Sequence, residues 1–318
     1  MPLLELKEVS RYYLQGQGLL GRKKDVIRAV DKVSLVLNEG ESLGLVGESG
    51  CGKSTLAKLI LKLERPNRGQ IIFRGQDILS ASKGVIYSYR RQVQLVFQDS
   101  FSAFNPRMRV REIINEPLEN FFPGKRATYL QRTCELLKLV GLHQDCLDNY
   151  PHQLSGGQRQ RLGIARALVS QPKLLICDEA IATLDVSLQG QMLSLFQELK
   201  AKLGLSYIFI SHNLPAVQYL ADKIAVMYGG RIVEILSREQ LLRDAQHPYT
   251  LSLLDALPVT HPREKNRKRV ILKGEACCGA HGCRFHPRCS EAQDICHHHE
   301  PVLWGSEEHL VACHLFRS

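Results

Sequence analysis

Residues 47–54 read Gly-Glu-Ser-Gly-Cys-Gly-Lys-Ser, a pattern whose glycines, lysine and hydroxyl group could together bind phosphate. The small and apolar residues 43–46 before it are typical of a buried strand, and residues 55–63 after it have apolar side chains at helical spacing. In that context the glycines let backbone N–H groups turn toward phosphate oxygens, and the helix start adds partial positive charge. We expect Lys53 to reach the β- and γ-phosphates of a nucleotide and Ser54 to hold Mg²⁺. The alternative, a glycine turn before a core helix, fits this strand–loop–helix context less well. The predicted phosphate-binding residues are Gly47, Glu48, Ser49, Gly50, Cys51, Gly52, Lys53, Ser54 and Thr55.

Polar side chains also follow three other apolar runs that are typical of buried strands. Gln98 follows residues 93–97, Asp178 and Glu179 end the run that begins at residue 173, and His212 follows residues 207–210. Gln98 could offer an amide oxygen to Mg²⁺ or to an attacking water, and Asp178 suits Mg²⁺ binding. Glu179 suits the general base for that water. Each of them alone could equally be a polar turn or a structural histidine. If the strands are parallel, their carboxyl ends meet at the ligand, and His212 would then touch the γ-phosphate.

Two further segments could complete such a site. Ser155 begins a predicted helix and is followed by two glycines, a phosphate-binding design without a lysine. We therefore expect this segment to complete a site rather than to form one; its residues are Ser155, Gly156, Gly157 and Gln158. Tyr13 ends the first predicted strand, where an aromatic ring could stack on adenine or simply pack on the surface.

Composition restricts the class of protein. The 318 residues are 44% hydrophobic and 23% charged, as in a globular domain with an extension. No apolar run approaches the roughly 20 residues of a membrane helix, and the N-terminus has no secretory pattern, so we expect a cytoplasmic chain. The formal net charge is +10, partly concentrated in residues 263–273. We interpret this charge as a solvated face and not as a nucleic-acid site.

The order of the predicted elements indicates an interrupted α/β fold. Residues 3–9 and 33–37 alternate like strands, whereas 110–116 and 127–140 have helical periodicity and break the βα alternation, which indicates an inserted helical subdomain. Further predicted elements are a helix over 187–203, a hairpin of residues 225–228 and 231–235, and short helices over 237–244 and 249–256. We expect a domain over residues 3–256, a linker over 257–274 and a cysteine-rich C-terminal module over 275–318.

These motifs, taken in this order, resemble the nucleotide-binding subunits of ATP-binding cassette (ABC) transporters over residues 3–256. The resemblance implies an α/β P-loop NTPase with an ABC-type RecA-like core, a helical subdomain over about residues 99–170, an antiparallel β subdomain and a small Cys-rich C-terminal extension. It makes residues 154–158 the family signature, Gln98 the loop facing the membrane subunits and Tyr13 the adenine-stacking aromatic. Residues 182–185, which end at Asp185, would cross to a partner chain.

A narrower resemblance is to importers of dipeptides, oligopeptides and nickel. It depends on residues 97–107, on the His-Pro-Tyr-Thr run at 247–250 and on the cysteine-bearing tail. The family commonly has proline where this chain has Ala180, and some nickel-importer subunits resemble the chain there, which favours nickel slightly over peptides. The sequence itself leaves the transported substrate open.

The family mechanism implies ATP and Mg²⁺ as ligands. Two chains would pack head to tail, and each ATP would lie between the phosphate loop of one chain and the signature of the other. The implied partners are a paralogous ATPase in a heterodimer, two membrane permease subunits and an extracytoplasmic substrate-binding protein, with no nucleic acid. The chain would then be peripheral, on the cytoplasmic face of the inner membrane. The alternative is a cassette ATPase of DNA repair or translation. The stretch between residues 54 and 154 is too short for a repair enzyme's coiled coil, and the chain has one phosphate loop where translation factors have two.

The C-terminal cysteines are a candidate metal site. Cys283, Cys289, Cys296 and Cys313 could together bind a tetrahedral Zn²⁺ or a [4Fe–4S] cluster. The tail has few apolar residues, and disulfides are disfavoured in the cytoplasm. The resemblance to peptide importers, some of which hold an iron–sulfur cluster, favours the cluster over zinc and over unliganded thiols. The pattern favours these four over Cys277, Cys278 and the histidines at 297–299.

Overall fold

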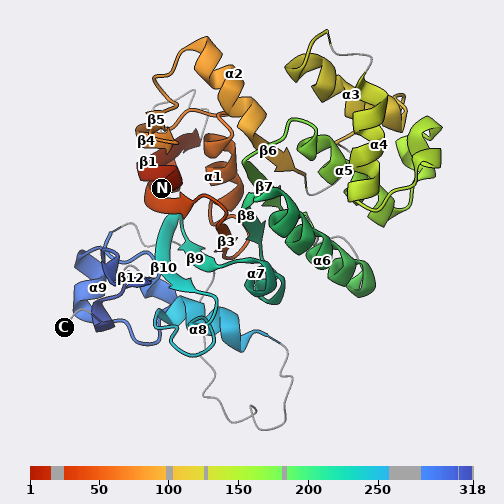
Figure 1. Cartoon of the computed structure of the whole chain (residues 1–318). Helices are drawn as coiled ribbons and strands as arrows, with labels where there is room; N and C mark the ends of the chain where they lie inside the picture. The colour runs from red at the N-terminus through yellow and green to blue at the C-terminus, as the bar shows by residue number, and fades with distance from the viewer. Residues whose placement is uncertain are drawn as a thin grey trace. The chain divides into compact units, whose positions relative to one another are not determined.

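The computed structural model of the chain (Figure 1) describes residues 1–15, 25–97, 103–124, 128–180, 185–257, 281–306 and 308–316. The chain divides into two compact units. Unit 1 consists of Met1–Leu4, Leu37–Ser42 and Ile72–Ser211, and unit 2 consists of Glu5–Val36, Leu43–Ile71 and His212–Ser318. Within the described residues, no helix has the length and apolarity needed to span a bilayer.

Unit 1 contains three parallel strands, β6 (Val93–Val96), β7 (Leu174–Asp178) and β8 (Ser206–Ser211). β7 and β8 are almost continuously buried, as expected for parallel strands covered on both faces. Their register sets Asp178 beside Ile210, so the two strands end together. A short strand β5 (Gln76–Asp77) pairs antiparallel with the end of β4 (Arg68–Phe73).

The helices of unit 1 include a compact group. α3 (Val110–Phe121), α4 (Tyr129–Leu139) and α5 (Gly156–Leu168) pack on one another, with the 3-10 helices η2 (Gln144–Asp148) and η3 (Pro151–Gln153) between α4 and α5 in the chain (Figure 1). This group lies inside the predicted helical subdomain, whose boundaries stay a prediction. The described part of unit 1 also contains α2 (Lys83–Gln92), which was not predicted from the sequence, and α6 (Val186–Leu203).

Unit 2 contains most of β1 (Pro2–Gln15), β2 (Asp25–Asn38) and β4, which are neighbours in one sheet in the order β2-β1-β4. A second set of strands begins with β3 (Ser42–Val46), which pairs in parallel with β9 (Lys223–Tyr228). β10 (Arg231–Ser237), β12 (His309–Val311) and β11 (Trp304–Gly305) follow, each antiparallel to its neighbour. The helices of unit 2 are α1 (Lys53–Ile60), α7 (Leu214–Leu220), α8 (Pro248–Asp255), α9 (Asp294–His298), η5 (His286–Arg288) and η6 (His314–Phe316).

One predicted helix of unit 2 is wrong. Residues 237–244 do not form a helix: β10 extends to Ser237, and turns follow over 238–244. Ser237 and Gln240 exchange hydrogen bonds between side chain and backbone, at 3.0 and 3.3 Å. The same exchange begins α5 elsewhere in the chain, and here helical bonds follow it from Leu241 N–H to Ser237 O at 3.2 Å and from Asp244 N–H to Gln240 O at 2.7 Å, but the segment stays a series of turns.

The C-terminal extension shares the core of unit 2. β12 extends the sheet beside β10, and Figure 1 shows β10, β12, α8 and α9 gathered at one side of the unit. Phe285 is 1% exposed and belongs to the same buried cluster as Tyr228 and Tyr249. The tail has few apolar residues of its own, and Phe285 packs it into the core of unit 2.

Candidate nucleotide-binding site

The phosphate loop joins β3 to α1 in unit 2, as the sequence predicts. Gly47 and Gly52 have φ angles of 153° and 109°. A Cβ atom at Gly47 would lie 2.2 Å from the carbonyl oxygen of Met227, and one at Gly52 would lie 2.0 Å from that of Ala29. Since two other backbone segments crowd the loop, only glycine fits at these positions.

The Lys53 side chain packs against the backbone of the phosphate loop. Its ammonium donates to the carbonyl oxygens of Gly47 at 2.7 Å and Glu48 at 2.9 Å, and its side chain is buried. Ser49 and Ser54 are exposed. The loop therefore has two exposed serines and a lysine whose ammonium lies against its backbone, which are groups that can bind phosphate.

Cys51 is the buried member of the loop. Its exposed fraction is 7%, and burial raises the pKa of its thiol, although the Lys53 charge acts in the opposite direction. Its carbonyl oxygen accepts a hydrogen bond from Gly230 N–H at 2.9 Å. The residue thus fixes the loop to the turn between β9 and β10, and we expect no reactive thiolate there.

Glu48 is held by residues that the sequence analysis did not single out. Arg288 donates two hydrogen bonds to its carboxylate, at 2.7 and 3.0 Å, and the Tyr249 hydroxyl accepts its backbone N–H at 2.7 Å. The carboxylate stabilises the charged guanidinium and raises the pKa of Arg288 above its ordinary value. Tyr249 belongs to the His-Pro-Tyr-Thr run at 247–250, and that pattern was the available signal. Arg288 had no local signal, since it lies far along the chain from the loop.

The predicted adenine-stacking residue Tyr13 already has contacts inside unit 2. Its hydroxyl donates to the Glu64 carboxylate at 2.5 Å, and the Arg11 guanidinium lies 4.7 Å from the centre of its ring. Arg11 also binds Glu64 at 3.1 Å. These contacts fix the ring at the end of β1, with one face covered by a cation.

The signature segment of unit 1 begins α5. Ser155 Oγ accepts Gln158 N–H at 3.2 Å, and Gln158 Oε1 accepts Ser155 N–H at 2.9 Å, which together form a capping box. Ser155, Gly156 and Gln158 are exposed, whereas Gly157 packs on Leu188 of α6. The segment therefore presents a capped helix N-terminus to the outside.

The two predicted carboxylates lie together at the end of β7. Asp178 is its last residue, and Glu179 follows with φ at 50°, a left-handed conformation that is uncommon for a side-chain-bearing residue. Glu179 N–H donates to Ile210 O at 2.8 Å, which ties it to β8. The chain therefore turns at Glu179, directly after the strand ends.

The other predicted residues have different outcomes. Asp185 caps α6 by accepting Leu188 N–H at 2.9 Å. His212 is exposed and directly follows β8 in the chain. Gln98 and the loop residues 182–184 lie outside the described residues, as do Cys277 and Cys278. Unit 1 thus brings together Asp178 and Glu179, and unit 2 brings together the phosphate loop, Tyr249 and Arg288.

The four C-terminal cysteines lie in unit 2, and none of them forms a disulfide. Burial raises the pKa of Cys283 to about 12 and that of Cys313 to about 11, and the thiols are close enough to influence one another electrostatically. Cys283 N–H also donates to Cys296 O at 2.8 Å. Among the described residues, no group of three or more histidine, cysteine or acidic side chains is arranged to hold a metal ion.

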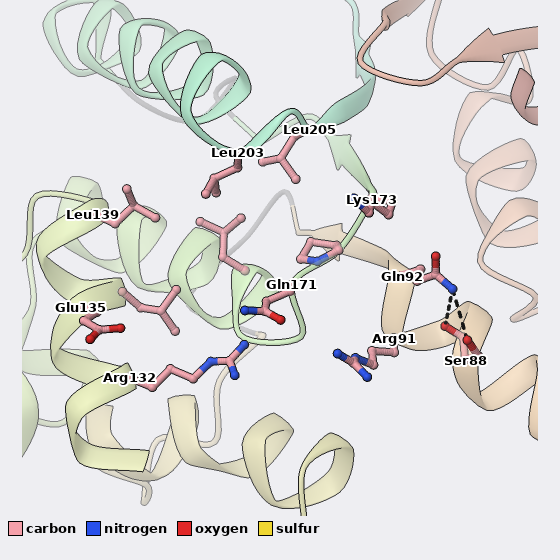
Figure 2. A pocket seen from close by; sticks show the side chains of 13 residues that line it. Ser88, Arg91, Gln92, Arg132, Glu135, Leu139, Gln171, Lys173, Leu203 and Leu205 are labelled. Atoms are coloured by element: carbon pink, nitrogen blue, oxygen red, sulfur yellow. Dashed lines mark hydrogen bonds between the residues drawn. The ribbon is translucent and has the colours of Figure 1, made fainter. Parts of the chain in front are cut away.

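A cavity of about 780 Å³ in unit 1 is separate from these residues. Figure 2 shows Arg91, Arg132 and Lys173 at its wall beside leucine side chains. Arg132 donates to Val169 O at 2.7 Å and Arg91 to Ser170 O at 3.3 Å, so both arginines bind carbonyl groups just after α5. Burial and the Arg91 charge lower the pKa of Arg132. The cavity contains none of the predicted site residues.

Comparisons with known proteins define the class. The model of the ABC transporter family matches residues 30–182, and that of the oligopeptide/dipeptide transporter C-terminal region matches residues 233–296. The oligopeptide transport ATP-binding protein AppF of Bacillus subtilis is 44% identical over 99% of this chain and 97% of its own length. The oligopeptide transport ATP-binding protein OppF of Escherichia coli is 40% identical over 98% and 95%, and the dipeptide transport ATP-binding protein DppF of Haemophilus influenzae is 39% identical over 98% and 96%.

Solved structures agree with the fold. The cbiO1 protein of Clostridium perfringens, part of an ABC transporter complex, matches with a TM-score of 0.66 at 26% identity, over 76% of this chain and 91% of that one. A dimeric ATP-binding cassette in a post-hydrolysis state, bound to ADP and phosphate, matches with a TM-score of 0.65 at 26% identity, over 74% and 98%. The P-loop NTPase fold of the ABC type is therefore confirmed.

The chain is an ATP-binding cassette protein, whose activity is ATP hydrolysis coupled to transport and which works with membrane permeases. Within that class, it belongs to the family of oligopeptide/dipeptide transporter ATP-binding proteins. The predicted resemblance is confirmed at both levels.

Proposed function

We propose that the chain supplies the energy for import of short peptides. The observation that carries the proposal is the match of residues 233–296 to the oligopeptide/dipeptide transporter C-terminal region, together with relatives named for peptide transport along almost the whole chain. Nickel, which Ala180 favoured slightly, has no comparable support. The same match disfavours a role in DNA repair or translation.

Uptake by the intact transporter tests this proposal. Cells that lack the gene should lose accumulation of labelled di- or oligopeptides, and a chain carrying Lys53→Ala should not restore it. Labelled nickel is the matched alternative substrate. Nickel uptake that depends on Lys53, with peptide uptake unchanged, would replace peptides by nickel in the proposal.

The chemistry is assigned residue by residue. Lys53 would bind the β- and γ-phosphates, and Glu179 would accept a proton from the attacking water. His212 would contact the γ-phosphate, and Gln98 would orient the water. Tyr13 would stack on adenine.

The oxygen groups on the chain fit Mg²⁺. The Ser54 hydroxyl is exposed at the start of α1, and the Asp178 carboxylate is part-exposed at the end of β7, which are ligand types that Mg²⁺ prefers. When bound, the ion would neutralise phosphate charge. Gln98 completes the predicted ligand set.

The remaining catalytic roles can be separated by substitution. Glu179→Gln should leave ATP binding intact and stop turnover in the assembled complex, because the amide cannot take up the proton. Lys53→Ala should prevent ATP binding itself. Near-normal hydrolysis by Glu179→Gln would show that the general base lies elsewhere.

The proposed assembly pairs this chain with a paralogous ATPase, two permeases and an extracytoplasmic binding protein, at the cytoplasmic face of the inner membrane. The signature supports a shared site, since Ser155, Gly156 and Gln158 are exposed and a capped helix N-terminus open to the outside suits the nucleotide of a partner chain. Asp185 would lie in the loop that crosses to the partner.

The purified chain should be mostly monomeric with weak ATPase activity that rises with its partners. Transport-coupled activity from this chain alone would refute the heteromeric assembly.

The four cysteines are proposed to hold a [4Fe–4S] cluster, with Zn²⁺ as the alternative. Four thiols are the donor type that either group takes, and Cys289 and Cys296 lie close enough to influence both Cys283 and Cys313 electrostatically. Against it stands the lack, in the described residues, of side chains already arranged as metal ligands. Anaerobic purification followed by absorbance and metal analysis tests the assignment. One zinc per chain would exclude the cluster, and ready alkylation of Cys283, Cys289, Cys296 and Cys313 without metal would exclude both.

A further inference from the structure

We propose that Arg288 of the C-terminal extension is a positioning residue for ATP binding: it neutralises and fixes Glu48, so that the extension sets the affinity of the phosphate loop for nucleotide. The proposal rests on the assignment of residues 47–55 as the phosphate site. It adds a residue from outside the cassette motifs to that site.

The contact between Arg288 and Glu48 is a two-pronged ion pair. Arg288 Nη1 and Nη2 lie 2.7 and 3.0 Å from the two carboxylate oxygens, and the two side chains are 9% and 33% exposed. A bidentate pair of this kind fixes orientation as well as charge. Glu48 directly follows Gly47, the first residue of the loop, so its position constrains how the loop begins.

The backbone of Glu48 is fixed as well. Its N–H donates to the Tyr249 hydroxyl at 2.7 Å, and Tyr249 is fully buried. The ring of Tyr249 lies 5.5 Å from that of Phe285, which belongs to the extension. The extension therefore reaches Glu48 by two routes, directly through Arg288 and through the packing of Tyr249.

The negative charge of Glu48 explains why an arginine beside the loop would favour nucleotide binding. A carboxylate inside a phosphate loop repels the polyanion that the loop must bind. Arg288 cancels that charge without itself being part of the loop. Without Arg288, an uncompensated carboxylate would face the incoming phosphates.

A second arginine anchors the extension behind the loop. Arg284 donates to the Asp31 carboxylate and to Gly229 O, and Asp31 N–H donates to Gly230 O at 2.8 Å. Gly230 N–H in turn donates to Cys51 O at 2.9 Å. Arg284 of the extension is therefore connected to Cys51 of the phosphate loop through Asp31 and residues 229–230, in addition to the direct contact of Arg288 with Glu48.

Both arginines are neighbours of cysteines in the sequence. Arg284 follows Cys283 and Arg288 precedes Cys289. A change in the conformation of the cysteine segment would move the arginine side chains and so alter the loop. By linkage, nucleotide bound at the loop must stabilise that segment to the same degree.

Nucleotide affinity of the full chain tests the proposal, with titration of a fluorescent ATP analogue in the presence of Mg²⁺. Arg288→Ala should weaken binding by about tenfold, a typical coupling between sites. Glu48→Gln should tighten binding, and the double variant Arg288→Ala/Glu48→Gln should recover most of the loss, because no carboxylate remains to be neutralised. An unchanged affinity for Arg288→Ala, or a double variant as weak as Arg288→Ala, would overturn the proposal.

Arg288→Lys covers the case in which the alanine variant does not fold. Lysine keeps one charge but loses the fork, so its affinity should lie between wild type and the alanine variant. Arg238→Ala is the matched control, since Arg238 pairs with Glu239 on the surface, with 46% and 68% of the two side chains exposed. A loss of the same size in Arg238→Ala would contradict a specific role for Arg288.

Hydrogen exchange provides the reciprocal measurement. Addition of the ATP analogue should slow exchange in residues 283–296 of the wild-type chain, and the effect should shrink in Arg288→Ala. No protection in wild type at saturating nucleotide would refute the coupling. Lys53→Ala is expected to bind no nucleotide. If the wild-type chain also binds none, the assignment of residues 47–55 as the phosphate site is wrong, which is a different failure from a loss of coupling.

Discussion

Replacing Phe285 by alanine tests whether the C-terminal extension is a structural part of unit 2. The Phe285 side chain is 1% exposed and lies edge-on to Tyr228, with ring centres 5.1 Å apart and an angle of 86° between the rings. A buried phenylalanine truncated to alanine costs about 3–5 kcal/mol, which includes the cavity that remains. We therefore expect Phe285→Ala to lower the free energy of unfolding by at least about 3 kcal/mol.

The assay is urea denaturation of the full chain, combined with hydrogen exchange in β9 and β10. Phe285→Ala should lower protection in both strands, because the ring packs on Tyr228 at the end of β9. Trp304→Ala is the control: this larger side chain in the same extension is 52% exposed and should change stability by only about 0.5 kcal/mol. If Phe285→Ala costs no more than Trp304→Ala, or leaves β9 and β10 unaffected, then the extension is not part of the core of unit 2.

Three further predictions concern the loop, the pH dependence and the signature. Gly52→Ala should abolish ATP binding in a titration of folded protein, since its Cβ would lie 2.0 Å from Ala29 O. Burial lowers the pKa of His247 to about 3, below its ordinary 6.5, so the unfolded chain binds the extra proton as the pH falls. Stability should therefore decrease by about 2 kcal/mol between pH 7 and 5 in urea denaturation, and His247→Asn, which keeps the helix cap, should remove that decrease. Ser155→Ala should cost about 1 kcal/mol of stability through the lost cap of α5, and Ser155→Asp should preserve it; equal stabilities of the two variants would contradict the capping role.

Features that depend on neighbouring residues could be predicted from the sequence. The phosphate loop joins a buried strand to a helix as expected, and the exchange between Ser155 and Gln158 is a local pattern. α7 could have been predicted too, because Asn213 caps it and Pro215 lies in its first turn. Its shortness concealed the apolar periodicity on which the sequence analysis depended.

Helix α2 was beyond that approach for a different reason. Of its residues only Tyr89 is buried, so there is no apolar stripe for periodicity to detect. The stretch after Ser237 shows the opposite error: a helix was predicted over 237–244, whereas the structure has turns over 238–244. Periodicity reports which side chains are buried, and it reports backbone conformation only indirectly.

The contacts around Glu48 show what no local pattern could reveal. A glutamate inside a phosphate loop is electrostatically unfavourable for ATP, and its partner Arg288 lies in a segment that the sequence identified only by its cysteines. Tyr249 was noted as part of a family pattern without a physical role, and the structure supplies one, the acceptor for Glu48 N–H at 2.7 Å. A carboxylate in the loop, a buried hydroxyl and an arginine beside the cysteines are each unexplained alone. Together they form one arrangement: Arg288 pairs with the charge of the Glu48 carboxylate, and the Tyr249 hydroxyl accepts the Glu48 N–H. Without these partners, the polar groups would lose their hydrogen bonds at a cost in free energy.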